Sequence, residues 1–533
     1  MRHDPVSLAL DAALFAACAD EMGLVLQRSA HSPNIKERLD FSCAVFDGAG
    51  RLVAQAAHIP VHLGSMPTAA RAALALEGLG EGDTVVLNDP YAGGTHLPDI
   101  TLVSPVFLGG TRPEFVVASR AHHADVGGAA PGSMPLAREI YEEGLRIPPL
   151  RLERGGRRVE EVWRLLLANV RTPHERAADL AAQLGAQRAG ARRLAAFAAA
   201  RGRTGVVRAA AAVMDHGERA AGAALARLPR GTFRFEDALD DDGLGNGPIR
   251  IALALRLDGS TARFDYRGSA PQTRGPVNAV LPVTLAASTY ALRCAIGGEL
   301  PVNDGLFRRI ALDAPPGSVV NARLPAAVSA GNVETSQRIV DVALGAFARA
   351  LPDRMPAASS GTMNNLLIGG FDPRRGVPFA YYETLGGGHG GGPAGPGESA
   401  MQAHMTNTRN TPVEALEHEY PFEVEWTRIR RRSGGAGRFA GGDGIHRAIR
   451  VRVPARVTVI SERRVRGPYG LAGGQRGAPG ENQLFDPAQP RRPRRMPGKF
   501  QIDVPAGAVL AVASPGGGGF GRPRSIRRRK RAK

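Results

Sequence analysis

Two neighbouring segments organise this chain: residues 88–107 read NDPYAGGTHLPDITLVSPVF, and residues 115–128 read FVVASRAHHADVGG. Each combines a short apolar run with a polar, Gly-rich turn. This pattern predicts two strands, with His and Asp side chains gathered where the strands begin or end. Imidazole and carboxylate groups on loops held by strands are typical of metal sites and of acid–base sites.

The first hypothesis for these segments is a metal site. His96 and Asp99 are three residues apart, and His122 follows 26 residues after His96. If the two apolar runs pair in one sheet, the loops that carry these side chains meet. His122 and His123 face opposite ways in an extended backbone, so we expect only one of them to bind a metal beside His96 and Asp99. Two His and one Asp leave positions open for water or substrate, which is the catalytic form of a metal site.

Three further side chains of the segments are candidates for catalysis. Asp125 and Asp89 could bind the ion or orient a ligand imidazole, and with His123 they are the catalytic candidates. The alternative is that all these residues are hydrogen-bonded polar groups in a buried turn without a metal. No HExxH or CxxC pattern decides between the two.

Substrate contacts are expected from two later segments. Residues 384–397 read TLGGGHGGGPAGPG, and so much glycine indicates either close backbone approach to a ligand or a mobile lid, which we place at 386–392. His389 within it is a candidate substrate contact, although the sequence favours an incidental loop histidine. The entry to a predicted helix near residue 411 is rich in polar groups that suit a carboxylate or amide: His404, Asn407, Arg409 and Asn410.

Composition sets the class of protein. The chain has 533 residues, of which 43% are hydrophobic and 22% charged, as in ordinary globular proteins. No apolar run reaches the roughly 18 residues that a membrane span needs. The N-terminal stretch contains acidic residues, and its apolar positions recur at helical spacing, so we interpret it as an amphipathic helix over 6–30 rather than a signal peptide. Three scattered cysteines exclude a disulfide scaffold. We therefore expect a cytoplasmic protein.

The charge distribution argues against nucleic acid as the specific ligand. The net charge is +18, but the tail from Arg522 to Lys533 holds eight Lys or Arg and no acid, so the rest carries 18 − 8 = +10. A basic tail binds polyanions without specificity. Only 5% of residues are aromatic, which leaves few platforms for base stacking.

The predicted fold is α/β of the mixed α+β kind, a multi-region chain with mixed sheets and helical insertions. Residues 1–230 form an N-terminal region with the His/Asp site and a helical segment. Residues 231–521 form a region of mixed sheets and helices with Gly-rich loops, because apolar and polar residues alternate from Gly231 onward as they do in strands. Residues 522–533 are predicted to be a disordered basic tail.

Segments along nearly the whole chain resemble the hydantoinase B/oxoprolinase family, the B-type subunit of ATP-dependent hydantoinases and 5-oxoprolinases. They are ERLDFSCAVFD, IPVHLGSMP, the two segments quoted first, EIYEEGLRIPP, AGNVETSQRIVD, NTRNTPVEALEHEYPFEVE, SGGAGRFAGGDGI and SPGGGGFG. The resemblance runs from about residue 5 to 521, and the basic tail is not part of it.

The resemblance implies a hetero-oligomer with an A-type partner that binds ATP, which agrees with the lack of a GxxxxGK[ST] phosphate loop here. It implies a divalent metal (Mn, Zn or Fe) on residues matching His96, Asp99 and one of the His122–His123 pair. The implied activity is ATP-dependent opening of a lactam or hydantoin ring, as by a 5-oxoprolinase or N-methylhydantoinase. The alternatives are a subunit of an acetone or acetophenone carboxylase, and a non-catalytic scaffold for the ATP-binding partner.

Overall fold

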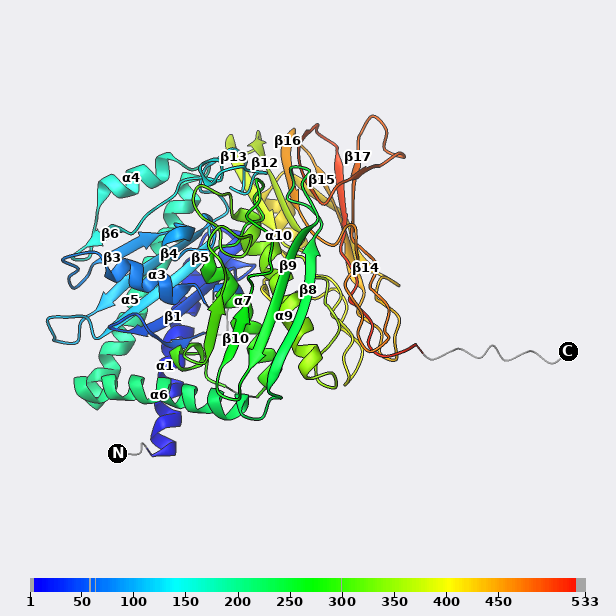
Figure 1. Ribbon diagram of the computed structural model, residues 1–533. Helices are drawn as coiled ribbons and strands as arrows, with labels where there is room; N and C mark the ends of the chain where they lie inside the picture. Colours follow the sequence, from blue (N-terminus) through cyan, green and yellow to red (C-terminus); the bar gives the residue numbers. More distant parts are fainter. Residues whose placement is uncertain (1–3, 57–58, 63, 299, 524–533) are drawn as a thin grey trace.

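The computed structural model describes residues 4–523 except 57–58, 63 and 299. These residues form four β-sheets with helices packed against them (Figure 1). The mixed α/β class expected from the sequence is confirmed. From residue 524 onward, the tail predicted to be disordered lies outside the described residues.

The first sheet has the order β2-β1-β5-β4-β3-β6-β7, and its pairs are antiparallel. Its strands are β1 (Phe41–Asp47), β2 (Leu52–Gln55), β3 (Thr84–Leu87), β4 (Asp99–Val106), β5 (Phe115–His122), β6 (Leu150–Arg154) and β7 (Arg157–Arg158). Every residue of β1, β4 and β5 is buried. Both faces of the sheet are therefore covered, which explains why these strands read as nearly continuous apolar runs. The predicted pairing of the two opening segments is confirmed, because β4 and β5 are neighbours.

Helices from the same region cover this sheet (Figure 1). One face packs against α1 (Pro5–Ser29), α5 (Pro173–Arg201) and α6 (Arg203–Leu225), and the other against α3 (Met66–Leu74). Two glutamines of α5 fasten it to the sheet. Gln183 Nε2 donates to the Ile100 carbonyl at 3.1 Å, and Gln187 Nε2 to the Leu102 carbonyl at 2.7 Å. The short helices α2 (Pro33–Lys36) and α4 (Glu160–Ala168) complete this part.

The second sheet has the order β11-β10-β9-β8. Its strands are β8 (Gly231–Leu239), β9 (Ile249–Leu257), β10 (Ala262–Asp265) and β11 (Ile310–Asp313). Alternate residues of β9 are buried, so one face packs on a core that includes α7 (Leu281–Ile296) and α9 (Ser336–Ala350). The helix α8 (Asp304–Phe307) precedes β11. A π-helical turn, η4 (Gly331–Thr335), runs directly into α9. Such turns are frequent at functional sites.

Two more sheets form the C-terminal part, on the right of Figure 1. Their orders are β13-β12-β16-β19 and β14-β15-β20-β17-β18, and apolar side chains from both meet in one core. The elements are β12 (Asn365–Asp372), β13 (Val377–Glu383), α10 (Val413–Glu419), β14 (Phe422–Arg430), β15 (Gly444–Val451), β16 (Ala455–Ile460), β17 (Glu481–Phe485), β18 (Arg494–Met496), β19 (Lys499–Val504) and β20 (Val509–Ala513).

The glycine-rich stretch at 386–392 is packed against other backbone segments. It lies against two other glycine-rich segments, and backbone hydrogen bonds join them: Gly391 N donates to the Gly518 carbonyl at 2.8 Å and Gly442 N to the His389 carbonyl at 2.8 Å. A Cβ built on Gly388 would lie 1.9 Å from the Gly442 oxygen. Glycine is used here because extended backbones pack in direct contact. This packing favours a scaffold role over the lid hypothesis, because composition alone does not reveal what the segment packs against.

Candidate metal site

Strand register brings the principal candidates together. Asp99 begins β4 and His122 ends β5, and the two are directly opposite in the antiparallel pair. His96 lies in the turn before β4, and its carbonyl accepts a hydrogen bond from Asp99 N at 3.1 Å. All three side chains are buried. Two loops distant in sequence therefore meet at one end of the sheet.

Three ligand atoms form a nearly equilateral triangle. His96 Nε2, His122 Nδ1 and Asp99 Oδ1 are each 3.2 Å from the other two. Ligands at about 2.1 Å from one ion are separated by about 3.0–3.4 Å in octahedral or tetrahedral geometry. The three residues could therefore hold a metal ion, with one ligand atom from each. A cavity of about 20 Å³ lies beside them, which suits one ion or one water molecule.

The electrostatics of the cluster depend on Asp99. Burial alone would raise the pKa of the Asp99 carboxyl, but His96, His62 and His122 outweigh it and hold that pKa well below its usual range. Burial opposes protonation of His96, yet the Asp99 carboxylate and the Ser329 carbonyl raise its pKa overall. Burial lowers the pKa of His122, which favours a neutral ring. The shifts of Asp99 and His122 favour the protonation states that metal binding requires, whereas His96 must be deprotonated to bind an ion, so metal binding and proton release are coupled there.

Asp99 has a second group of neighbours that the sequence did not reveal. Its Oδ2 atom lies 3.3 Å from Nε2 of His62, on the 3₁₀ turn η1 (Pro60–His62), and accepts a hydrogen bond from the hydroxyl of Thr95. Asn332 Nδ2, on η4, donates to the same oxygen at 3.5 Å. His62 was part of a segment that resembled the family, but nothing in its spacing placed it beside Asp99.

The C-terminal part closes the site. The ring of Tyr382, at the end of β13, stacks on His122 with centroids 4.4 Å apart, and its hydroxyl donates to Asn365 Oδ1 at 2.9 Å. The Arg38 guanidinium covers Tyr382 at 4.7 Å. The remaining wall comes from several elements and contains one carboxylate, Asp40, whose charge raises the pKa of His96 and opposes the lowering of the His122 pKa by burial. The other lining residues are Ile59, Val61, Val333, Met363, Thr384, Met405 and Thr406.

The other residues predicted for this site have different partners. His123 Nε2 is 2.9 Å from Gln183 Oε1, and because Gln183 Nε2 donates elsewhere, His123 must be the donor. Its ring therefore faces α5, and burial lowers its pKa. Asp125 Oδ1 pairs with Arg171 Nη1 at 2.8 Å, and its Oδ2 accepts from Arg171 N at 2.8 Å. Asp89 caps the 3₁₀ turn η2 (Pro90–Ala92). The structure thus brings together His96, Asp99 and His122 and leaves these three outside the cluster.

The predicted substrate contacts lie in the C-terminal part and have varied environments. His389 Nε2 donates to the Gln402 carbonyl at 2.8 Å, and Asn410 Nδ2 to the Thr384 carbonyl at 2.8 Å. The Nε2 atom of His404 is buried 3.9 Å from an Asp341 oxygen. Asn407 and Arg409 have exposed side chains. The segment is nevertheless close to the site, because Met405 and Thr406 line the cavity.

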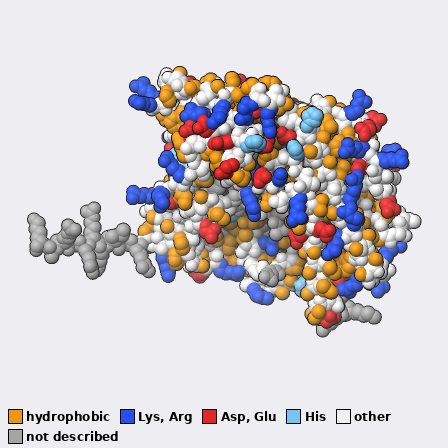
Figure 2. Space-filling model, turned by 180° about the vertical axis from the view of Figure 1, so that it is seen from behind, with side chains coloured by type: hydrophobic (Ala, Val, Ile, Leu, Met, Phe, Trp, Pro, Cys, Tyr) orange, Lys and Arg blue, Asp and Glu red, His pale blue; other side chains and the backbone are white. Residues whose placement is uncertain are grey.

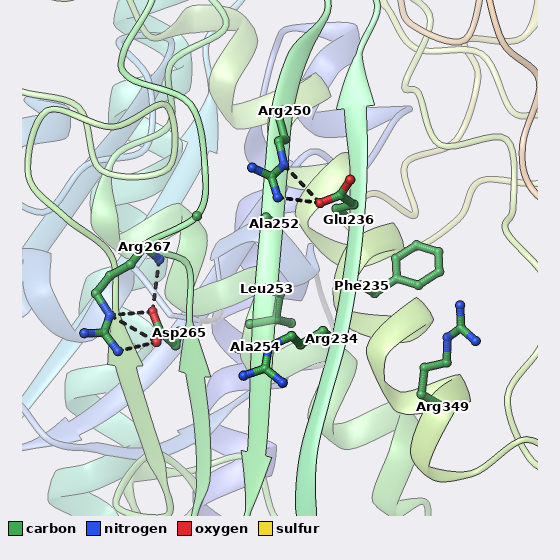
Figure 3. Close-up of a pocket in the computed structure, with 11 residues that line it drawn as sticks. Arg234, Phe235, Glu236, Arg250, Ala252, Leu253, Ala254, Asp265, Arg267 and Arg349 are labelled. Carbon is green, nitrogen blue, oxygen red and sulfur yellow. Dashed lines mark hydrogen bonds and ion pairs between the residues drawn. The ribbon is translucent and has the colours of Figure 1, made fainter.

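A larger groove of about 760 Å³ lies on the second sheet (Figure 3). Two of its arginines are paired with carboxylates that also line it: Arg250 with Glu236 at 2.6 Å and Arg267 with Asp265 at 2.5 Å. On the face shown in Figure 2, basic side chains are likewise interspersed with acidic and apolar ones. Among the helices described, none combines the length and apolar character that crossing a membrane requires.

Fold and site together define a mixed α/β protein with a buried His–Asp–His cluster. The model of the Hydantoinase B/oxoprolinase family matches residues 4–523, and the chain belongs to this family. 5-Oxoprolinase 1 of Arabidopsis thaliana is 40% identical over 547 residues, covering 97% of this chain and 42% of that protein. The chain thus spans less than half of that relative's length.

Two further relatives match along most of their own length. A protein of Pseudomonas sp. (strain NS671), named as the B component of a D-/L-hydantoinase, is 28% identical over 543 residues, covering 98% of this chain and 90% of the relative. The crystal structure of ATP-dependent caprolactamase from Pseudomonas jessenii has the same fold, with a TM-score of 0.91 and 28% identity. The match covers 98% of this chain and 93% of the other.

Proposed function

We propose that this chain is the B-type subunit of an ATP-dependent hydrolase that opens a cyclic amide, of the 5-oxoprolinase or N-methylhydantoinase type. The observation that carries the proposal is the buried cluster of His96, Asp99 and His122, in a chain that matches the family over 4–523. The names of three similar proteins agree with the proposal: one is an oxoprolinase, one a hydantoinase component and one an ATP-dependent caprolactamase.

The chemistry needs two contributions. A ring amide resists water because resonance makes its carbonyl a poor electrophile. Transfer of a phosphoryl group from ATP to the amide oxygen creates a better electrophile and a leaving group, so that ATP, amide and water give ADP, phosphate and the opened ring. We assign ATP binding to an A-type partner, since this sequence has no GxxxxGK[ST] motif.

The second contribution is made by this chain. A divalent ion, when bound, would supply Lewis-acid chemistry. His96, Asp99 and His122 would hold it, and the donor set of two imidazoles and one carboxylate suits Mn, Fe or Zn. The apolar side chains of Ile59, Val333 and Met405 limit the entry of bulk water, which protects a phosphorylated intermediate from unproductive hydrolysis.

Coexpression with an A-type partner tests the proposal. The purified complex is given ATP with 5-oxoproline, hydantoin or caprolactam, and in a separate arm a ketone with bicarbonate; ADP and product are measured. Hydrolysis of a ring amide supports the proposal, and carboxylation of the ketone instead would contradict it.

An Asp99→Ala variant shows whether the cluster takes part in turnover. We expect at least a hundredfold loss of kcat, with no loss in His174→Leu, a matched control that removes an exposed histidine. Full turnover by Asp99→Ala would instead mean that this chain is a scaffold and that the partner performs the chemistry.

A further inference from the structure

The far oxygen of Asp99 is held by side chains outside the metal cluster. Oδ1 lies near the rings of His96 and His122. Oδ2 instead has three hydrogen-bond donors around it, which come from Thr95, His62 and Asn332. A carboxylate oxygen has two lone pairs, so three donors leave Oδ2 no vacant acceptor site. Only Oδ1 is left to bind an ion.

The hydrogen bonds around His62 determine where its proton lies. Ser42 Oγ accepts from Ile59 N at 3.3 Å and lies 2.8 Å from His62 Nδ1. The Ser42 hydroxyl can donate to Nδ1. An ionised carboxylate only accepts hydrogen bonds, so the His62 nitrogen that faces Asp99, which is Nε2, carries a proton. That atom is 3.3 Å from Asp99 Oδ2, so the ring donates to the carboxylate.

We propose that His62 is a positioning residue that keeps Asp99 a one-oxygen ligand, and that it is not itself a ligand. The inference rests on the metal binding proposed above. Both nitrogens of His62 are engaged, Nδ1 by Ser42 and Nε2 by Asp99, so neither offers a lone pair to an ion. His62 is 1% exposed, so its ring cannot turn away without displacing the side chains packed around it. Partners of ligating carboxylates affect metal affinity nearly as strongly as the ligands do.

The test is metal affinity in the full chain, measured by Mn²⁺ titration of wild type and four variants. We expect His62→Leu to weaken Mn²⁺ binding ten- to a hundredfold and Ser42→Ala to weaken it less. His62→Gln retains an N–H donor and is expected within about fivefold of wild type on the same reasoning. His174→Leu, the exposed histidine control, is expected to bind as wild type does.

The visible spectrum of the Co²⁺-loaded chain separates positioning from ligation. If His62 holds Asp99, His62→Leu changes the bands through altered carboxylate binding, and His62→Gln restores the wild-type spectrum. If His62 is a ligand, both variants lose a nitrogen donor and neither spectrum recovers; that result would overturn the proposal, as would wild-type affinity in His62→Leu. Should the leucine variant fail to fold, the Ser42→Ala and His62→Gln titrations still decide. If the wild-type chain binds no divalent ion, both this inference and the metal proposal are wrong. If it binds Mn²⁺ normally but the complex shows no turnover, only the proposed function is wrong.

Discussion

Substitution of Gly388 by Ala tests whether the glycine-rich stretch is packed scaffold. The new Cβ would lie 1.9 Å from the Gly442 oxygen and 2.4 Å from Gly517 N, both backbone atoms. Contact at ordinary distance requires the segments to separate by more than 1 Å. That shift weakens hydrogen bonds from Gly388 N to the Pro515 carbonyl at 3.1 Å and from Ser360 N to the Gly388 carbonyl at 2.8 Å.

The expected loss follows from three contributions. Overpacking costs about 1–3 kcal/mol, and each weakened hydrogen bond about 1 kcal/mol. The unfolded chain loses entropy on gaining a Cβ, which returns about 0.4–1 kcal/mol. The free energy of unfolding should therefore fall by about 2–5 kcal/mol on the sum of these effects.

The assay is urea denaturation followed by circular dichroism, with Gly395→Ala as the matched control. A Cβ on Gly395 meets nothing within 4 Å, so its stability should change by less than about 1 kcal/mol. Wild-type stability in Gly388→Ala would refute the packing argument. A stable variant with a selective loss of turnover would restore the lid hypothesis.

Three other predictions concern the site and its neighbours. His96→Ala should reduce the bound divalent metal at least tenfold by mass spectrometry of the purified chain, because two ligands remain of three; retention of full metal would exclude the cluster as the site. Arg171→Ala should lower stability by about 1–3 kcal/mol in denaturant melts, since it leaves Asp125 buried without its ion pair; metal content should not change, and its loss would show that Asp125 belongs to the site after all. Burial lowers the pKa of His404 to about 3. Between pH 6.5 and 3 the unfolded chain therefore binds one more proton than the folded chain, so the free energy of unfolding falls as the pH falls through that window. His404→Asn should remove up to about 1.4 kcal/mol per pH unit of that slope, and an unchanged slope in melts from pH 6.5 to 5 would contradict the burial of a neutral ring.

The sequence predicted the elements that carry the site well. The apolar runs of β4 and β5 were recognisable because each is short, β-branched and bounded by turns. Their pairing was a condition of the metal hypothesis, and the structure shows it. The same logic led to His96 and Asp99, which lie in one turn three residues apart. These features are local, and local spacing is what an amino-acid sequence records directly.

Local sequence could not show which of His122 and His123 lies beside His96. Alternation along a strand places the two rings on opposite sides, but it does not say which side faces His96. The register with β4 decides it, because His122 is opposite Asp99 while His123 meets Gln183 on α5. The part played by Asp125 was likewise decided by Arg171, 46 residues away.

What the sequence by itself determined was therefore the kind of chemistry: imidazoles and a carboxylate at the ends of two adjoining strands, on a chain with a family's motifs along its length. Only the tertiary structure decided that His62 and Tyr382 complete the surroundings of that cluster and that the glycine-rich stretch is structural. Both depend on contacts between segments far apart in the chain. Such contacts depend on how whole sheets pack, and no spacing or composition within a segment encodes them.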